Sequence, residues 1–164
     1  MDAPSCGLSV TPGGNLLVTC WQPNKLLELS ADNGQCVREI TLQSDTQYPR
    51  HGVQLTTGQY VVCHGHRVCI VDDDGRVTRS YGGQRGSDVG QLNWPSHVVV
   101  DEDSQFIYVA DFHNDRVVLL SSTLEFVRYV SEELSAPCRL HLDHTTRRLY
   151  VAQFLGNVVV VIQL

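Results

Sequence analysis

The sequence predicts an all-β protein of the β-propeller class, with about four blades that each contain up to four strands. Three features of the sequence support this prediction: a segment that recurs every 42 to 46 residues, four short β-branched and aliphatic runs in each copy, and no sustained apolar period of 3.6 residues. With 42% hydrophobic and 18% charged residues, the composition is that of a folded globular domain.

The repeat is clearest in the second half of the chain. Pro95, Asp101, Tyr108 and Ala110 each have an identical residue 42 positions later. The prolines that lead the copies stand at positions 4, 49, 95 and 137, which gives spacings of 45, 46 and 42 residues. We therefore expect one domain over residues 1–164, with units at about 4–48, 49–94, 95–136 and 137–164. The last unit stops in its third strand, so the chain should contain about fifteen strands.

The third unit shows the four expected strands of a blade most plainly. They are His97–Asp101, Phe106–Ala110, Arg116–Leu120 and Phe126–Val130, separated by short polar connections typical of hairpins. The valine runs suit strands that are buried on both faces. In the second unit, the stretch of residues 72–75 (DDDG) predicts a tight Asp-Gly hairpin rather than a calcium loop, because it lacks the later glutamate of an EF-hand.

Residues 81–118, YGGQRGSDVGQLNWPSHVVVDEDSQFIYVADFHNDRVV, resemble an NHL repeat. The shared pattern is a glycine-rich lead, a proline before the innermost strand, an aspartate that ends it, a YVAD-like second strand, and an asparagine and Arg-Val before the third. The second unit departs most from this pattern. It has His64 and Gly65 where the pattern has an aspartate and an aromatic residue, and its turn is two residues shorter. The resemblance implies a six-bladed ring of which this chain forms a part. The alternative is an unusual short propeller or a half-ring that assembles with another copy.

Several function classes are disfavoured by the composition. The net charge of −6 argues against a default nucleic-acid partner, because phosphate binding depends on Lys and Arg. No apolar run is long enough to span a membrane, and the first residues lack the features of a signal peptide. We expect a cytoplasmic protein with no membrane partner. Its six cysteines contain no CxxC pair and are interpreted as reduced thiols.

The loops that follow each second strand, and those between units, should share one face of a propeller. Aromatic and arginine side chains anchor protein interfaces, and these loops carry many of them. The basic and acidic residues of these loops balance, six to six, which favours a protein partner over RNA. RNA bound by stacking on Trp21 and Phe112 is the alternative. The candidate partner-binding residues are Trp21, Lys25, Tyr48, Arg50, His64, His66, Arg67, Arg85, Phe112, His113, Arg116, Arg139 and Phe154.

Catalysis has little support in the sequence. His64-Gly65-His66 beside Cys63 is a weak metal motif, and the peptidyl-amidating lyase that resembles this architecture is a less favoured alternative. Asp111 and Arg116 bracket a turn and are expected to fix it rather than to act as a catalytic pair. No nucleophile elbow, P-loop or zincin motif is present. We predict no catalytic residue, no metal and no cofactor.

The resemblance therefore implies a non-catalytic interaction platform. NHL propellers commonly form the C-terminal, substrate-recruiting domain of tripartite-motif (TRIM) ubiquitin ligases. Any ligase activity would require a RING domain, which is absent from this chain. An open arc of blades also exposes strand edges, so self-association is expected.

Overall fold

The computed structural model describes residues 5–164 and contains fifteen strands and one short 3-10 helix. The first eight strands are β1 (Ser5–Val10), β2 (Leu16–Trp21), β3 (Asn24–Leu29), β4 (Cys36–Thr41), β5 (Pro49–Gln54), β6 (Tyr60–His64), β7 (Arg67–Val71) and β8 (Val77–Gly82). The remaining elements are β9 (Pro95–Val100), β10 (Ile107–Asp111), the helix η1 (Phe112–Asn114), β11 (Arg116–Leu120), β12 (Phe126–Ser131), β13 (Pro137–Asp143), β14 (Arg148–Gln153) and β15 (Val159–Gln163).

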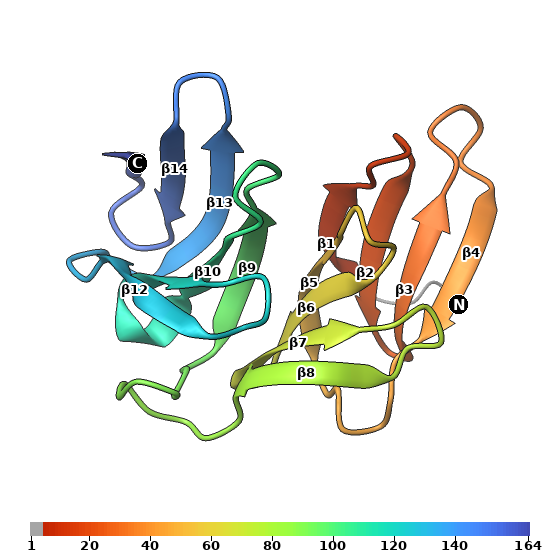
Figure 1. Ribbon diagram of the computed structural model, residues 1–164, viewed down its shortest axis with the longest axis horizontal. Helices are drawn as coiled ribbons and strands as arrows, with labels where there is room; N and C mark the ends of the chain where they lie inside the picture. The colour runs from red at the N-terminus through yellow and green to blue at the C-terminus, as the bar shows by residue number, and fades with distance from the viewer. Residues whose placement is uncertain (1–4) are drawn as a thin grey trace.

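The strands form four antiparallel sheets, each made of strands consecutive in the chain. The first three blades are β1–β4, β5–β8 and β9–β12, and the fourth is the three-stranded sheet β13–β15. Innermost strands of neighbouring blades lie side by side, β1 with β5, β5 with β9 and β9 with β13. Figure 1 shows the blades following one another around an arc, with an opening between the first and the fourth. The predicted all-β propeller of about four blades is confirmed.

The core lies between the blades rather than inside any one of them. Leu17 and Leu26 of the first blade pack against Tyr60 and Val62 of the second, and similar clusters join the second blade to the third and the third to the fourth. Strands β6, β10 and β11 are buried along their whole length, because a neighbouring blade covers each face. Each blade is therefore stabilised mainly by its neighbours.

The local turn chemistry agrees with the sequence prediction at residues 72–75. Asp72 Oδ1 accepts hydrogen bonds from the backbone N–H groups of Asp74 and Arg76, at 3.0 and 2.9 Å. Gly75 has a φ of 79°, and a Cβ atom there would collide with the backbone of Thr41. This stretch is a hairpin turn between β7 and β8. Within the third blade, the predicted strand Arg116–Leu120 is confirmed, and the other three differ from the structure by one or two residues at their ends, since the ladder extends to Pro95 and Asp111.

An irregularity of the same kind occurs in the innermost strands of the second, third and fourth blades. The β-ladder register shifts at the residue after the leading proline, so Arg50, Ser96 and Cys138 fall outside the regular pairing. A bulge of this kind redirects the extra side chain away from the sheet. These three positions therefore project toward the end of the propeller where the candidate site lies.

Among residues 5–164, no helix has the length and apolar character needed to cross a lipid bilayer.

Candidate functional site

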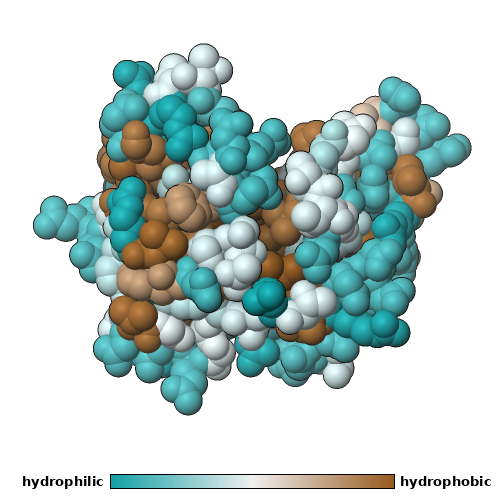
Figure 2. All heavy atoms as spheres, in the orientation of Figure 1, coloured by the Kyte–Doolittle hydropathy of each residue, from teal (hydrophilic) through white to brown (hydrophobic). Residues whose placement is uncertain are grey.

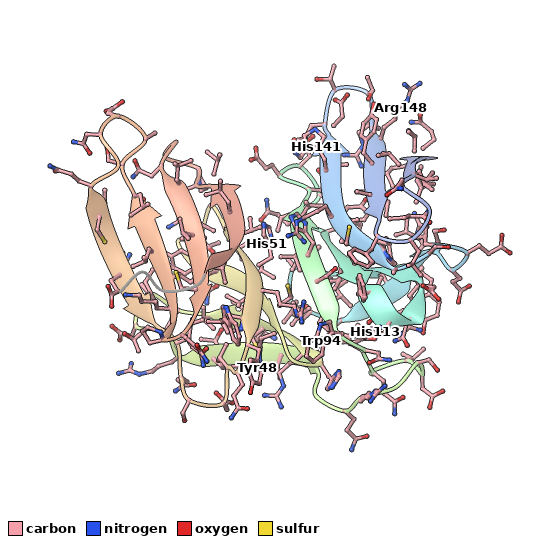
Figure 3. All side chains as sticks on the ribbon, turned by 180° about the vertical axis from the view of Figure 1, so that it is seen from behind. Tyr48, His51, Trp94, His113, His141 and Arg148 are labelled. Atoms are coloured by element: carbon pink, nitrogen blue, oxygen red, sulfur yellow. The ribbon has the colours of Figure 1, made fainter. Side chains whose placement is uncertain are left out.

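Two groups of contacting aromatic rings line one end of the molecule, from the first blade to the fourth. The ring centroids of Trp21 and Tyr48 are 5.8 Å apart, those of Trp94 and His113 are 6.3 Å apart, and those of Phe112 and Phe154 are 5.9 Å apart. Figure 3 shows Tyr48, Trp94 and His113 gathered at this end, with Arg148 at the opposite end. We call the set the aromatic row: Trp21, Tyr48, Trp94, His113, Phe112 and Phe154.

Trp94 lies at the centre of the aromatic row. Its backbone has a φ of 67°, in the left-handed region, so the chain turns sharply just before Pro95. The Arg50 guanidinium lies over the indole, 4.1 Å from the ring centroid, which is a cation–π geometry. The Trp94 backbone N–H donates to His66 Nδ1 at 3.3 Å. These contacts hold the indole between the second and third blades.

Two hollows lie on either side of the Arg50–Trp94 pair. The first hollow, about 330 Å³, is walled by Trp21, Tyr48, Pro49, Arg50 and Trp94. The second hollow, about 490 Å³, is lined by Arg50, Trp94, Ser96, Phe112, Cys138, Arg139 and Phe154. Volumes of this size are those of small ligand pockets. The bulged residues Arg50, Ser96 and Cys138 all reach the second hollow, so the register shift in three blades builds it.

Arg116 was predicted to contact a partner, and this prediction is wrong. The side chain is buried, with the residue only 5% exposed, and its Nε lies 2.9 Å from Asp111 Oδ2. Its other nitrogens donate to the backbone carbonyls of Ser87 and Gln91 in the loop between the second and third blades. The expectation that Asp111 and Arg116 fix the turn is confirmed, and the same pair also fastens the inter-blade loop.

His64 was also predicted to lie on the partner face, but it is buried. Its Nε2 lies 3.0 Å from Cys69 Sγ, and burial lowers the pKa of His64 to about 4. Burial also raises the pKa of Cys69 to about 12, so the two groups form a neutral contact at pH 7. His66 points elsewhere, toward the Trp94 backbone. The two histidines of the HGH sequence therefore have separate structural roles.

The remaining predicted residues differ in how accessible they are to a binding partner. Lys25 forms an ion pair with Glu39 at 3.0 Å, and Arg67 forms one with Asp45 at 3.6 Å. Arg85, His113, Arg139, Tyr48 and Phe154 are exposed, Phe154 to 67%. Within residues 5–164, Arg139 makes no ion pair. Exposed aromatic side chains and Arg139 thus dominate the accessible part of this end.

Two histidines join the innermost strands near the propeller axis. The rings of His51 and His97 stack with centroids 3.7 Å apart and planes 22° apart. The Val98 N–H donates to His51 Nδ1 at 3.5 Å, which leaves Nε2 to donate to the Leu8 carbonyl at 3.3 Å. His97 Nδ1 likewise accepts the Leu140 N–H at 3.4 Å. Each imidazole therefore caps backbone groups of neighbouring blades, and we call His51 and His97 the histidine clamps.

Burial keeps both histidine clamps neutral. It lowers the pKa of His51 to about 4, and burial together with the charge of His51 and Arg139 lowers the pKa of His97 to about 2. In the part of the chain that the structure describes, no group of three His, Cys, Asp or Glu side chains converges as metal ligands would. The side chains of Cys36, Cys63, Cys69 and Cys138 are free thiols.

Sequence reasoning missed Ser96, Cys138 and the central place of Trp94. A signal was present: Arg50, Ser96 and Cys138 each follow the leading proline of a unit, and His51 and His97 each follow one residue later. Equivalent positions of a repeat protein lie at equivalent places around the axis. Superposing the units by their prolines would have grouped these residues.

No protein-family model matches the chain, and no curated protein matches its sequence. Solved structures do match: hydrazine synthase of Kuenenia stuttgartiensis, with a TM-score of 0.75 and 17% identity, covers 99% of this chain. The nidogen/laminin complex matches with a TM-score of 0.77 and 14% identity over 98% of this chain. Virginiamycin B lyase from Staphylococcus aureus matches with a TM-score of 0.65 and 11% identity over 99% of this chain.

The similarity to these structures shows the propeller fold alone. The chain covers 47% of the hydrazine synthase chain, 61% of the nidogen/laminin chain and 56% of the lyase chain. It therefore spans about half to three-fifths of these larger structures. Because enzymes and a binding complex appear together, the fold does not assign a function.

Proposed function

We propose that this propeller segment is a non-catalytic platform that binds a protein partner on the aromatic row. The observation that carries the proposal is the set of aromatic rings that lines one end of all four blades, from Trp21 to Phe154, with the exposed Arg139 beside it. Aromatic and arginine side chains are the residue types that contribute most to protein interfaces. By its resemblance to NHL repeats, the platform would recruit substrates to a TRIM-type ubiquitin ligase in the cytoplasm.

A protein partner suits this end better than RNA does. RNA-binding surfaces need a track of basic groups along the phosphate backbone. Here Lys25 and Arg67 already pair with Glu39 and Asp45, and Arg116 is buried. The cations that remain are too few to follow a nucleic-acid strand across four blades.

Affinity capture with matched variants tests the proposal. The double variant Tyr48→Asn, Phe154→Ser removes two exposed rings of the aromatic row, and asparagine tolerates the left-handed backbone at position 48. The control Val37→Ser, Val127→Ser removes two exposed apolar side chains from outer strands. Proteins retained from cell extract are identified by mass spectrometry, with and without ribonuclease.

We expect specific proteins that the wild type and the control retain, that the aromatic-row variant loses, and that survive ribonuclease. Equal retention by both variants would place binding elsewhere on the molecule. Loss of all retained material after ribonuclease would indicate an RNA-binding module instead.

A further inference from the structure

The two hollows beside Trp94 differ in chemistry and share one wall. Trp21, Tyr48, Pro49 and Trp94 surround the first hollow, and Arg50 supplies its only charged group. The second hollow contains two guanidinium groups, those of Arg50 and Arg139. The Arg50–Trp94 pair stands between them, with the guanidinium stacked on the indole at 4.1 Å.

The first hollow suits a flat apolar group. Aromatic walls favour another ring, which can pack edge-to-face or offset against the indoles and the phenol. A cage of aromatic rings also binds cations, but the charge of Arg50 at this wall opposes a second cation. The walls therefore select an uncharged ring over a methylated lysine or a choline group.

The second hollow suits an anion. Its neutral polar side chains already donate hydrogen bonds to backbone carbonyls. Ser96 Oγ donates to the Pro137 carbonyl at 3.0 Å, and Cys138 Sγ donates to the Ala152 carbonyl at 3.4 Å. The exposed Arg139 has no carboxylate partner among residues 5–164. The nearby His51 and His97 are neutral at physiological pH, so the local charge is set by the two guanidinium groups.

We propose that the paired hollows bind a linear acidic peptide, with one aromatic side chain in the first hollow and a neighbouring carboxylate beside Arg50 and Arg139 in the second. This inference rests on the proposed function and names the chemistry of its ligand. Arginine binds carboxylates through paired, charge-assisted hydrogen bonds, and an aromatic anchor in a pocket is a typical binding hot spot. A peptide with this pairing occupies both hollows at once.

A nucleotide also joins a ring to an anion, but the surroundings favour a peptide. The exposed Asp45 lies with Trp94 in the lining of a neighbouring hollow, and the whole chain carries a net charge of −6. A peptide needs positive charge only where its carboxylate lies, whereas each further phosphate of a nucleic acid needs its own cation.

Tryptophan fluorescence gives a direct readout, because the only two tryptophans of the chain, Trp21 and Trp94, both wall the first hollow. The probe is a short peptide with one phenylalanine flanked by aspartate and glutamate, which adds no tryptophan signal. Two matched peptides replace the phenylalanine by alanine or the acidic residues by lysine. Oligouridylate is the nucleic-acid probe.

We expect the acidic phenylalanine peptide to change the emission in a saturable way, and each matched peptide to bind at least about 10-fold more weakly. Arg139→Glu should weaken the acidic peptide by about 10-fold or more, and Tyr48→Asn should weaken the phenylalanine peptide but not its alanine form. Arg148→Glu is the control, since this exposed arginine lies at the far end of the fourth blade (Figure 3).

The inference is overturned if the acidic phenylalanine peptide shows no saturation up to about 1 mM, or if Arg148→Glu weakens it as much as Arg139→Glu does. Tighter, strongly salt-dependent binding of oligouridylate would replace the peptide by a nucleic acid. If protein capture still depends on the aromatic row while the peptide fails, the platform stands and only the ligand chemistry proposed here is wrong.

Discussion

The third and fourth blades carry matching side chains on the face that points away from the preceding blade, but only the third blade buries them. Tyr108 and Val117 of the third blade have Tyr150 and Val159 as counterparts 42 residues later. Val117 is 0% exposed, because the fourth blade covers it, whereas Val159 is 58% exposed. Figure 2 shows hydrophobic side chains on the surface over the fourth blade.

The first blade shows the same difference in burial on its opposite face. Leu8 pairs with Val18 in the same way that Val98 pairs with Val109 in the third blade. Val98 is fully buried against the second blade, while Leu8 is 61% exposed. A blade of this fold therefore has two apolar faces by sequence, and its neighbours determine whether they become core.

The largest expected effect comes from the buried ion pair of the third blade. Replacing Arg116 by alanine leaves the Asp111 carboxylate buried without its cation and should lower the free energy of unfolding by about 3–5 kcal/mol. Its counterpart in the fourth blade is Val158, which is exposed, and Val158→Ala should cost less than about 0.5 kcal/mol. Urea unfolding of both variants measures the contrast, and similar losses would contradict it.

The valine pair tests the comparison with identical chemistry. Val117→Ala removes two methyl groups from a filled core and should cost about 2–3 kcal/mol, whereas Val159→Ala should cost less than about 0.5 kcal/mol. The same urea titrations measure both values. If Val159→Ala destabilises as strongly as Val117→Ala, the fourth blade's outer face is covered in solution.

How far the sequence could predict these elements depends on the range of the interactions involved. The propeller, the Asp-Gly turn at residues 72–75 and the Asp111–Arg116 contact follow from the repeat and from turn chemistry, which are local. The burial of His64 and Arg116 was missed because it depends on how one blade covers the next. The two hollows also required the structure, since their walls come from loops and bulged residues of different blades.

Acidification should destabilise the protein through the histidine clamps. The pKa of His51 in the fold is about 4, below the ordinary value of 6.5, so the unfolded chain binds more protons between these values. Its contribution to stability is therefore complete above pH 6.5 and is lost as the pH falls toward 4, with about 2 kcal/mol lost at pH 5.

His51→Gln provides the control for this prediction. The variant should start less stable at pH 7 but lose less stability between pH 7 and pH 5 than the wild type does. Urea midpoints at pH 7, 6 and 5 give the comparison. Despite its burial, hydrogen bonds from Ser104 and Arg147 hold the pKa of Asp101 at about 2, below this window. Burial raises the pKa of Asp111, but both proteins contain Asp111, so its contribution cancels in the comparison. Parallel pH profiles for the two proteins would show that His51 does not cause the loss.

The smallest effect on stability is expected at the exposed outer face of the fourth blade. Val159→Lys with Val161→Lys should change the free energy of unfolding by less than about 0.5 kcal/mol. We propose that the wild type self-associates through such open faces and edges, which charged side chains oppose. Light scattering should therefore show a smaller average mass for the double variant at equal concentration. Equal masses would contradict the proposal.

The histidine clamps also affect where another β-strand could add to this protein. The innermost strands are sheet edges whose backbone groups face the axis, and such edges are normally open to pairing. His51 already occupies the Val98 amide and the Leu8 carbonyl, and His97 occupies the Leu140 amide. These amides should exchange slowly with solvent deuterium although they lie on edge strands. The outer strands carry no such histidine cap in the part of the chain that the structure describes, so we expect an incoming segment to pair with an outer strand such as β15 rather than at the axis.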